Sequence, residues 1–218
     1  MVVRRRRIRI AKRKTPWYGK KYSALQLASK AWTAAKYLKG LVNSERMYAD
    51  RTCTLGAARS NVWGLTLLGQ GDSVGQRTGN SMLLRSIYIR GFCQINSSVT
   101  GNTRITLMIV RDNQQQPDTT PLVTDILKTE DPDSMINTNT AGRYKIVWRK
   151  NIALYPQSTG SGSVRDIQKY FKLYDHVRFN GTTSTDIQKH GYYLVMVTSE
   201  STNFPTIDIE TRIGYHDN

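Results

Sequence analysis

The chain has 218 residues and a formal net charge of +16, with thirty-two Lys and Arg against sixteen Asp and Glu. This length suits a single domain with a tail, and so large a positive charge indicates an anionic partner. No apolar run approaches the roughly 18 residues of a transmembrane helix, and no apolar segment follows the basic N-terminus. We therefore expect neither a membrane span nor a signal peptide.

The positive charge is concentrated near the N-terminus. Residues 1–39 hold thirteen Lys or Arg and no Asp or Glu, residues 1–51 carry a net charge of +13, and residues 52–218 carry only +3. Like charges at that density repel one another and resist burial. We therefore divide the chain into a basic arm, residues 1–42, which needs a polyanion, and a near-neutral body, residues 43–218.

The arm mixes cations with aromatic side chains, a combination that neutralises phosphates and stacks on unpaired bases. Basic clusters of this kind are typical of nucleic-acid-binding patches and of nuclear-import signals. A solvated, disordered tail is the alternative. We take ten cations and one aromatic residue as candidate nucleic-acid-binding residues: Arg4, Arg5, Arg6, Arg7, Arg9, Lys12, Arg13, Lys14, Lys20, Lys21 and Trp17.

A helix is predicted over Ala24–Lys39, which consists mostly of strong helix formers. Ser23 suits the N-cap, and Gly40 suits the left-handed position after a helix end. The apolar residues fall on one face, so this basic amphipathic helix could instead lie on a membrane surface. The basic clusters before it fit phosphate neutralisation better, so we expect no membrane partner and steeply salt-dependent binding.

After Gly40 apolar and polar residues alternate, the period-two pattern of strands with one buried face. Clusters of Gly, Asn, Ser, Thr and Pro separate the segments, and the loops are uneven in length. This pattern predicts an all-β fold, a single eight-stranded jelly-roll sandwich with a basic N-terminal arm and a short N-terminal helix, rather than an up-and-down barrel. The predicted strands are 47–55, 62–68, 86–95, 105–109, 144–154, 171–179, 192–198 and 207–215.

The connection Asp112–Gly142 is too long to be a plain linker in a compact domain. It contains one predicted helix, Pro121–Lys128, which has proline in its first turn. An acidic tip follows at Glu130, Asp131 and Asp133. Loops of this length usually make contacts, so we expect this one to do so.

The sequence carries no recognisable enzyme motif. The glycines of 69–75 invite a phosphate-loop interpretation, but no Gly-Lys-Ser/Thr is present and a strand follows, so we expect turns there. The three histidines are scattered, with no metal-ligand spacing. Cys53 and Cys93 fall in strand-like runs and are expected to be buried apolar residues. We therefore expect no enzymatic activity.

Two stretches of the body resemble the coat protein of satellite tobacco necrosis virus. They are Gly69-Gln-Gly-Asp-Ser-Val-Gly-Gln-Arg-Thr-Gly79, with the strand after it, and Ile109-Val-Arg-Asp-Asn113. In its arm the chain is more similar to the capsid (coat) proteins of small circular single-stranded DNA viruses, on Arg4–Arg7 and on the segment Ala34–Asn43. The resemblance extends over roughly the whole chain.

The resemblance implies a jelly-roll protein whose copies assemble into the smallest icosahedral shell. The arm would point inward onto a single-stranded genome, with DNA favoured, and host nuclear-import factors would be further partners. The implied locations are the virion and, during assembly, the host nucleus. The resemblance also implies calcium between subunits, held by Asp72 and Asp217, whereas a third acidic position of the family falls nearest Asn43 here.

We therefore expect a viral capsid protein that packages single-stranded nucleic acid. One alternative is a nucleic-acid-binding protein with a β-sandwich body that never forms shells. Another is an enzyme on a jelly-roll scaffold such as a cupin, which would need a cluster of metal ligands inside the barrel. The arm contacts phosphates and stacks on bases without reading the sugar, so it suits single-stranded DNA and RNA alike.

Overall fold

The protein divides into two units, Met1–Asn43 and Ser44–Asn218. Its structure is a computed structural model, and we treat the two units separately. The residues that the structure describes are 23–41, 46–114, 119–156 and 163–217.

The first unit is described as one helix, α1 (Ala24–Leu41). It begins with a capping box, in which Gln26 N–H donates to Ser23 Oγ (3.3 Å) and Ser23 N–H donates to Gln26 Oε1 (3.1 Å). The predicted N-cap is therefore confirmed. The predicted end is wrong, because α1 continues through Gly40, whose cost inside a helix is only about 1 kcal/mol. Within the described residues, no helix is both long and apolar enough to cross a membrane.

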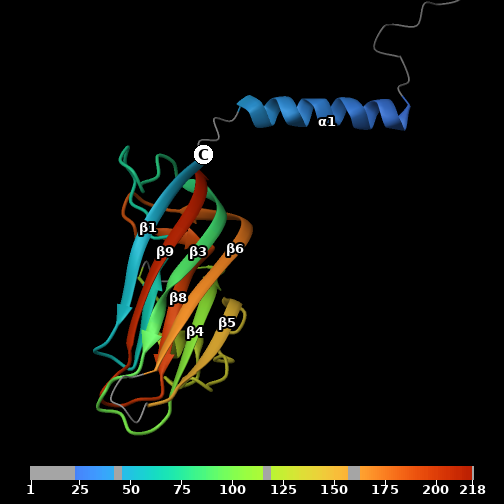
Figure 1. Cartoon of the computed structure of the whole chain (residues 1–218). Coiled ribbons are helices and arrows are strands. Elements are labelled where there is room, and N and C mark those ends of the chain that lie inside the picture. The colour runs from blue at the N-terminus through green and yellow to red at the C-terminus, as the bar shows by residue number, and fades with distance from the viewer. Residues whose placement is uncertain (1–22, 42–45, 115–118, 157–162, 218) are drawn as a thin grey trace, which may run out of the picture. The chain divides into compact units, whose positions relative to one another are not determined.

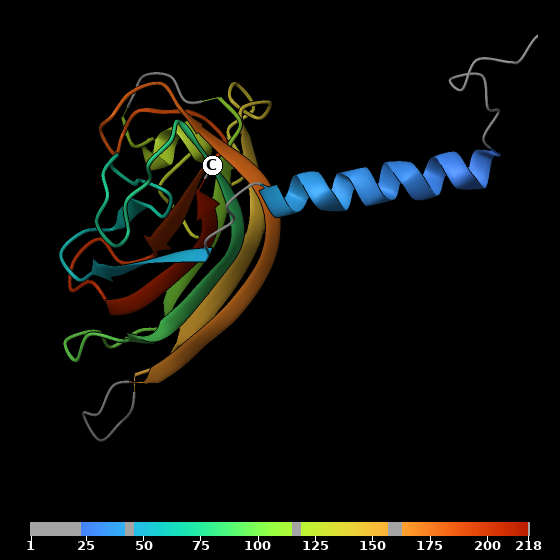
Figure 2. The same cartoon turned by 90° about the horizontal axis from the view of Figure 1, so that it is seen from above.

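The second unit is a sandwich of two antiparallel sheets (Figures 1 and 2). Sheet A has the strand order β1-β9-β3-β6-β7, and sheet B has the order β2-β8-β4-β5. The predicted all-β sandwich is therefore confirmed. The strands are β1 (Arg46–Leu55), β2 (Ser60–Gly64), β3 (Ser81–Gln94), β4 (Thr103–Asp112), β5 (Tyr144–Leu154), β6 (Val164–Phe179), β7 (Ile187–Lys189), β8 (Gly191–Thr198) and β9 (Thr206–Asp217).

The described residues contain nine strands where eight were predicted. The additional strand, β7, has three residues, too few to produce a periodic pattern. β6 begins at Val164 rather than near residue 171, because most of its first half is exposed and shows little alternation. β2 ends at Gly64, before the end of the predicted run, since Leu65 and Leu68 leave the sheet and are buried in the core.

Two hydrophobic clusters hold the sandwich together. The larger lies between the sheets, and the smaller covers the other face of sheet B, where Val195 and Val197 of β8 meet Val123 and Ile126 of the long connection. Every residue of β8 is therefore buried, which explains why that segment reads as apolar on both faces. The expectation that the long connection makes contacts is confirmed.

The helix of the long connection is shorter than predicted. α2 spans only Val123–Ile126, because Leu127 already forms a β-bridge with Ile136.

A pair of side chains joins the two ends of the long connection. Buried Asp112 accepts hydrogen bonds from Arg143 Nη2 (2.7 Å) and from Nε of the same residue (3.0 and 3.1 Å). This fork geometry fixes the start of the connection against its end.

Both cysteines are free and buried, as predicted. Cys53 and Cys93 belong to the cluster between the sheets. Burial raises the pKa of the Cys53 thiol to about 11 and that of the Cys93 thiol to about 12. The two thiols therefore stay protonated at neutral pH and pack as small apolar groups.

Arg77 is a fully buried side chain that joins two loops. Its Nε donates to Leu68 O (3.0 Å), its Nη1 donates to Gly79 O (2.5 Å) and its Nη2 donates to Gly181 O. The guanidinium also lies over the ring of Phe179, 3.9 Å from the centroid. The turn that begins at Gly69 is thus held to the loop after β6 by one planar cation, which the sequence did not reveal as an anchor.

We predict that Arg77→Lys lowers the free energy of unfolding by about 2–4 kcal/mol, because an ammonium group has its three donors on one atom and cannot reach the three carbonyls that Nε, Nη1 and Nη2 reach from separate positions. The measurement is denaturant unfolding. Arg178→Lys, a change of the same type at an exposed position of β6, should stay within about 0.5 kcal/mol of the parent. Equal stabilities for the two variants would contradict the anchoring role.

Candidate nucleic-acid interface

The eleven candidate residues of the arm, from Arg4 to Lys21, lie outside the described residues. Their contact with nucleic acid therefore stays a prediction. The body, in contrast, is described in side-chain detail. Its charged groups indicate which surface an anionic chain would contact.

Arginines neutralise several carboxylates of the body. Asp50 and Arg212 form a two-pronged pair on sheet A, with N–O distances of 2.7 and 2.6 Å. Hydrogen bonding to Arg212 lowers the pKa of Asp50, so this carboxylate stays charged and paired at neutral pH. Two of the three acidic residues at the tip of the long connection are also paired, each through a single contact, Asp131 with Arg59 and Asp133 with Arg104.

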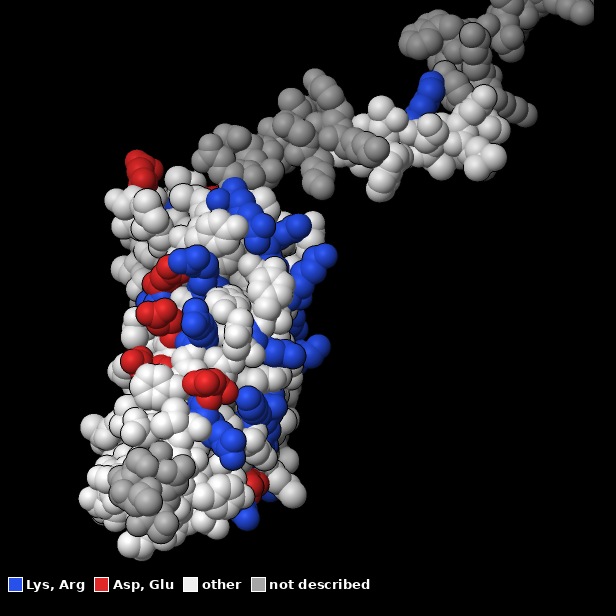
Figure 3. All heavy atoms as spheres, viewed as in Figure 1, with Lys and Arg blue, Asp and Glu red and all other residues white. Residues whose placement is uncertain are grey.

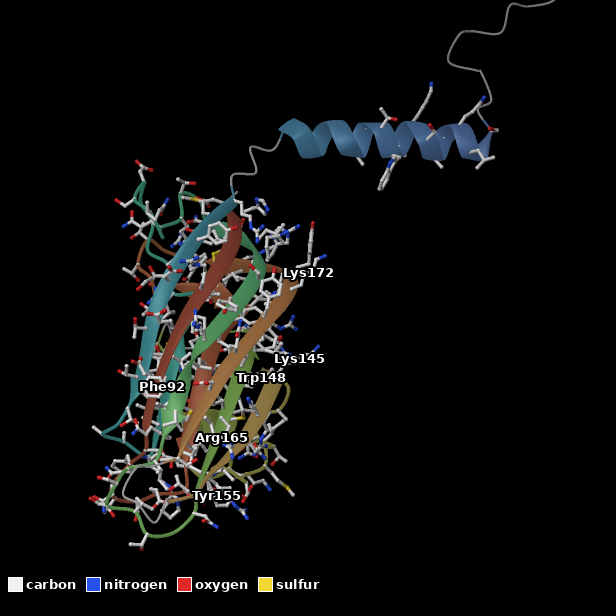
Figure 4. The ribbon with its side chains drawn as sticks, viewed as in Figure 1. Phe92, Lys145, Trp148, Tyr155, Arg165 and Lys172 are labelled. Carbon is white, nitrogen blue, oxygen red and sulfur yellow. The ribbon has the colours of Figure 1, made fainter. Side chains whose placement is uncertain are left out.

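The lysines of the body behave differently. In the described part of the body, no lysine takes part in a salt bridge. Six exposed cations on β5 and β6, which face each other from the two sheets, form no salt bridge. We leave out Arg178 at the end of β6 and call the other five the cationic edge: Lys145, Lys150, Arg165, Lys169 and Lys172, of which Lys145, Arg165 and Lys172 are labelled in Figure 4.

An aromatic pair lies within the cationic edge. The rings of Trp148 and Phe171 meet edge to face, with their centroids 5.6 Å apart. Both side chains are half-buried and pack against the core between the sheets. In Figure 4 Trp148 lies between Lys145 and Arg165 on the same side of the body. The cations therefore flank an aromatic pair whose position is fixed by packing against the core.

Charge on this side of the body is uneven. Figure 3 shows Lys and Arg gathered on the β6 side, and Asp and Glu mainly toward β1 and β9. Such a basic surface is the electrostatic footprint of nucleic-acid binding. An alternative explanation is that cations on unpaired strand edges prevent pairing with other chains. A binding measurement separates these two roles.

The side-chain cluster that most resembles an enzyme centre surrounds Asp175. Its carboxylate accepts hydrogen bonds from Arg111 Nη1 (2.9 Å) and Tyr192 Oη (2.8 Å), and it pairs with His190 Nδ1 at 2.8 Å. Burial, and next the bond to Asp175, raise the pKa of Tyr192 above its usual range. These groups satisfy one another and join β6 of sheet A to β4 and β8 of sheet B, so we interpret the cluster as a clamp between the sheets.

The predicted calcium ligands lie near the turn that Arg77 anchors. Asp217 already accepts hydrogen bonds from the backbone N–H and, at 2.6 Å, from Oγ1 of Thr78, while Asp72 is exposed. Among the described residues, no three His, Cys, Asp or Glu side chains come close enough together to hold a metal ion. Calcium needs six to eight oxygens, and the described carboxylates of one chain do not gather to supply them. Calcium between subunits stays a prediction.

Comparisons with known proteins give no family for this chain. No family model matches it, and no curated protein matches it. One solved structure that it resembles is the crystal structure of dimeric latent PorU from Porphyromonas gingivalis, at a TM-score of 0.35 and 10% sequence identity. That match covers 80% of this chain but only 14% of PorU. A likeness at that level carries no argument about function.

We predict that the double variant Lys150→Gln, Lys169→Gln binds single-stranded DNA with a smaller salt dependence. Each lost phosphate contact should reduce the slope of log K against log salt by about 0.7. The measurement is fluorescence anisotropy over a salt series with the full-length protein.

The matched control is Lys128→Gln, Lys189→Gln, which removes two exposed lysines outside the cationic edge. If both double variants reduce the slope equally, the cationic edge contributes only net charge. If neither changes it, the cations of β5 and β6 only protect strand edges.

Proposed function

We propose that this protein is a viral capsid protein that self-assembles into a small icosahedral shell and packages single-stranded nucleic acid, with DNA favoured, through its basic arm. One observation carries the proposal. Residues 1–39 hold thirteen cations and no carboxylate, and they are joined to a β sandwich whose remaining charge nearly balances. Cations so concentrated need a polyanion, and phosphates supply one.

The arrangement of strands supports the finer fold assignment. With the three-residue β7 taken as an extension of sheet A, eight strands remain in two sheets of four, β1-β9-β3-β6 and β2-β8-β4-β5. The chain passes from one sheet to the other at most of its connections. We infer a jelly roll, an architecture common to capsid domains and also to lectins and cupins.

The pairing of charges in the body supports assembly. Arginines hold Asp50, Asp131 and Asp133, so these carboxylates present little net charge to a neighbouring copy. This pairing removes these three carboxylates as a source of repulsion between neighbouring copies. The cationic edge and the arm would then face the packaged strand.

The remaining alternative is a nucleic-acid-binding protein that never forms shells. It shares the arm and the cationic edge, and it differs in the size of the particle. We predict that the purified full-length protein forms closed particles of megadalton mass, measured by light scattering and seen by negative-stain electron microscopy. A monomer or small oligomer at every salt concentration and pH would exclude the capsid assignment and favour the alternative.

We also predict that deleting residues 1–21 leaves a folded body that has lost most of its affinity for nucleic acid at moderate salt. The body has its own core, so circular dichroism should still report β structure. Binding is measured by anisotropy with single-stranded DNA. Full binding by the truncated chain would show that the arm is not the nucleic-acid-binding element. The shell-forming role is tested separately, by the particle measurement.

A further inference from the structure

The outward face of sheet A carries a group of tyrosines, here called the tyrosine face: Tyr48, Tyr88, Tyr170 and Tyr174. Tyr170 and Tyr174 are four residues apart on β6 and therefore point to the same side of the sheet. Tyr88 of β3 lies directly opposite Tyr170 in the register. The exposed fractions are 44% for Tyr48, 55% for Tyr170 and 64% for Tyr174, while Tyr88 is half-buried.

Cations lie among these rings. The guanidinium of Arg85 lies over the ring of Tyr174, 3.8 Å from the centroid, and that of Arg46 lies 5.1 Å from the ring of Tyr48. Lys172 falls between the two tyrosines of β6 on the same face and belongs to the cationic edge. The tyrosine face is therefore continuous with the basic surface described above.

Carboxylates border the tyrosine face on one side. Asp50 is paired with Arg212, and Glu210 lies opposite Arg90 in the register of β9 and β3. A hollow opens beside Tyr88, and these same four charged residues contribute to its lining. Arg51 also lines the hollow, so three arginines and two carboxylates surround it, and further cations lie toward β6.

We propose that the tyrosine face is a stacking platform for unpaired bases of a single-stranded nucleic acid, an inference that rests on the proposed function and adds a second contact surface to the arm. Exposed rings can stack on any base, although Arg85 already covers one face of the Tyr174 ring, and the neighbouring cations neutralise the phosphates between bases. A duplex presents its bases stacked and paired, so it cannot use these rings. The platform therefore selects single strands without reading their sequence.

The stacking contribution is separable from the contribution of the arm. Phosphate contacts set the slope of log K against log salt, whereas stacking adds affinity that salt changes little. Removing two rings should therefore weaken binding at all salt concentrations by a similar factor. Removing arm cations should instead reduce the slope.

The test uses the full-length double variant Tyr170→Leu, Tyr174→Leu, with a labelled oligothymidylate and a labelled duplex of the same length. We expect the affinity for the oligothymidylate to fall about 10-fold or more with an unchanged salt slope, and the affinity for the duplex to stay the same. Tyr155→Leu is the matched control, because Tyr155 is 50% exposed but follows β5 in sheet B (Figure 4). It should bind both probes as the parent does.

A second measurement does not depend on the folding of a variant. Ultraviolet cross-linking of the parent protein to a bromodeoxyuridine-substituted strand, followed by mass spectrometry, should place adducts on the peptides that contain β6. Unchanged oligothymidylate affinity in the double variant, an equal loss with the duplex, or adducts confined to the arm would each overturn the platform. Failure of the parent protein to bind any nucleic acid would instead overturn the proposed function.

Discussion

Charge compensation determines how the ionic side chains of this molecule are arranged. Inside the body, arginines provide that compensation locally, since planar forks grip Asp50 and Asp112 and a single guanidinium reaches Asp175. These pairs involve arginines and not lysines, and the lysines of β5 and β6 have no salt-bridge partner among the described residues. Cations left over in this way, and the far denser group in the arm, have to be compensated by something outside the chain.

The packing of the sandwich decides which surface is open to that partner. The long connection lies over sheet B and buries Val195 and Val197 beneath it, so one face of the sandwich is closed by its own chain. In the described part of the body, no segment covers sheet A over β1, β9, β3 and β6 in this way, and polar and aromatic side chains of these strands reach the surface. The open face is therefore the one that carries the tyrosines and adjoins the cationic edge.

Much of the fold was predictable because burial on one face imposes a two-residue period. That signal located the strands of the core, and it explains the burial of Cys53 and Cys93. The pattern failed where burial is absent, as at the exposed start of β6. It also could not reveal Arg77 as an anchor, since the carbonyls that it binds come from distant loops. Summing the charges of the whole body hid the cationic edge, because carboxylates elsewhere in the body offset the cations of these two consecutive strands.

The separation of paired and unpaired charge across the body has a consequence for how an encounter begins. A body whose excess cations lie at the β5 and β6 edge, away from β1 and β9, has an electric dipole moment directed along its sheets, and the field of a polyanion exerts a torque on it before contact. Each body would therefore turn its cationic edge toward the strand while still separated from it by a Debye length of about 8 Å. Neighbouring copies would then arrive with a common orientation, which shortens the search for matching surfaces.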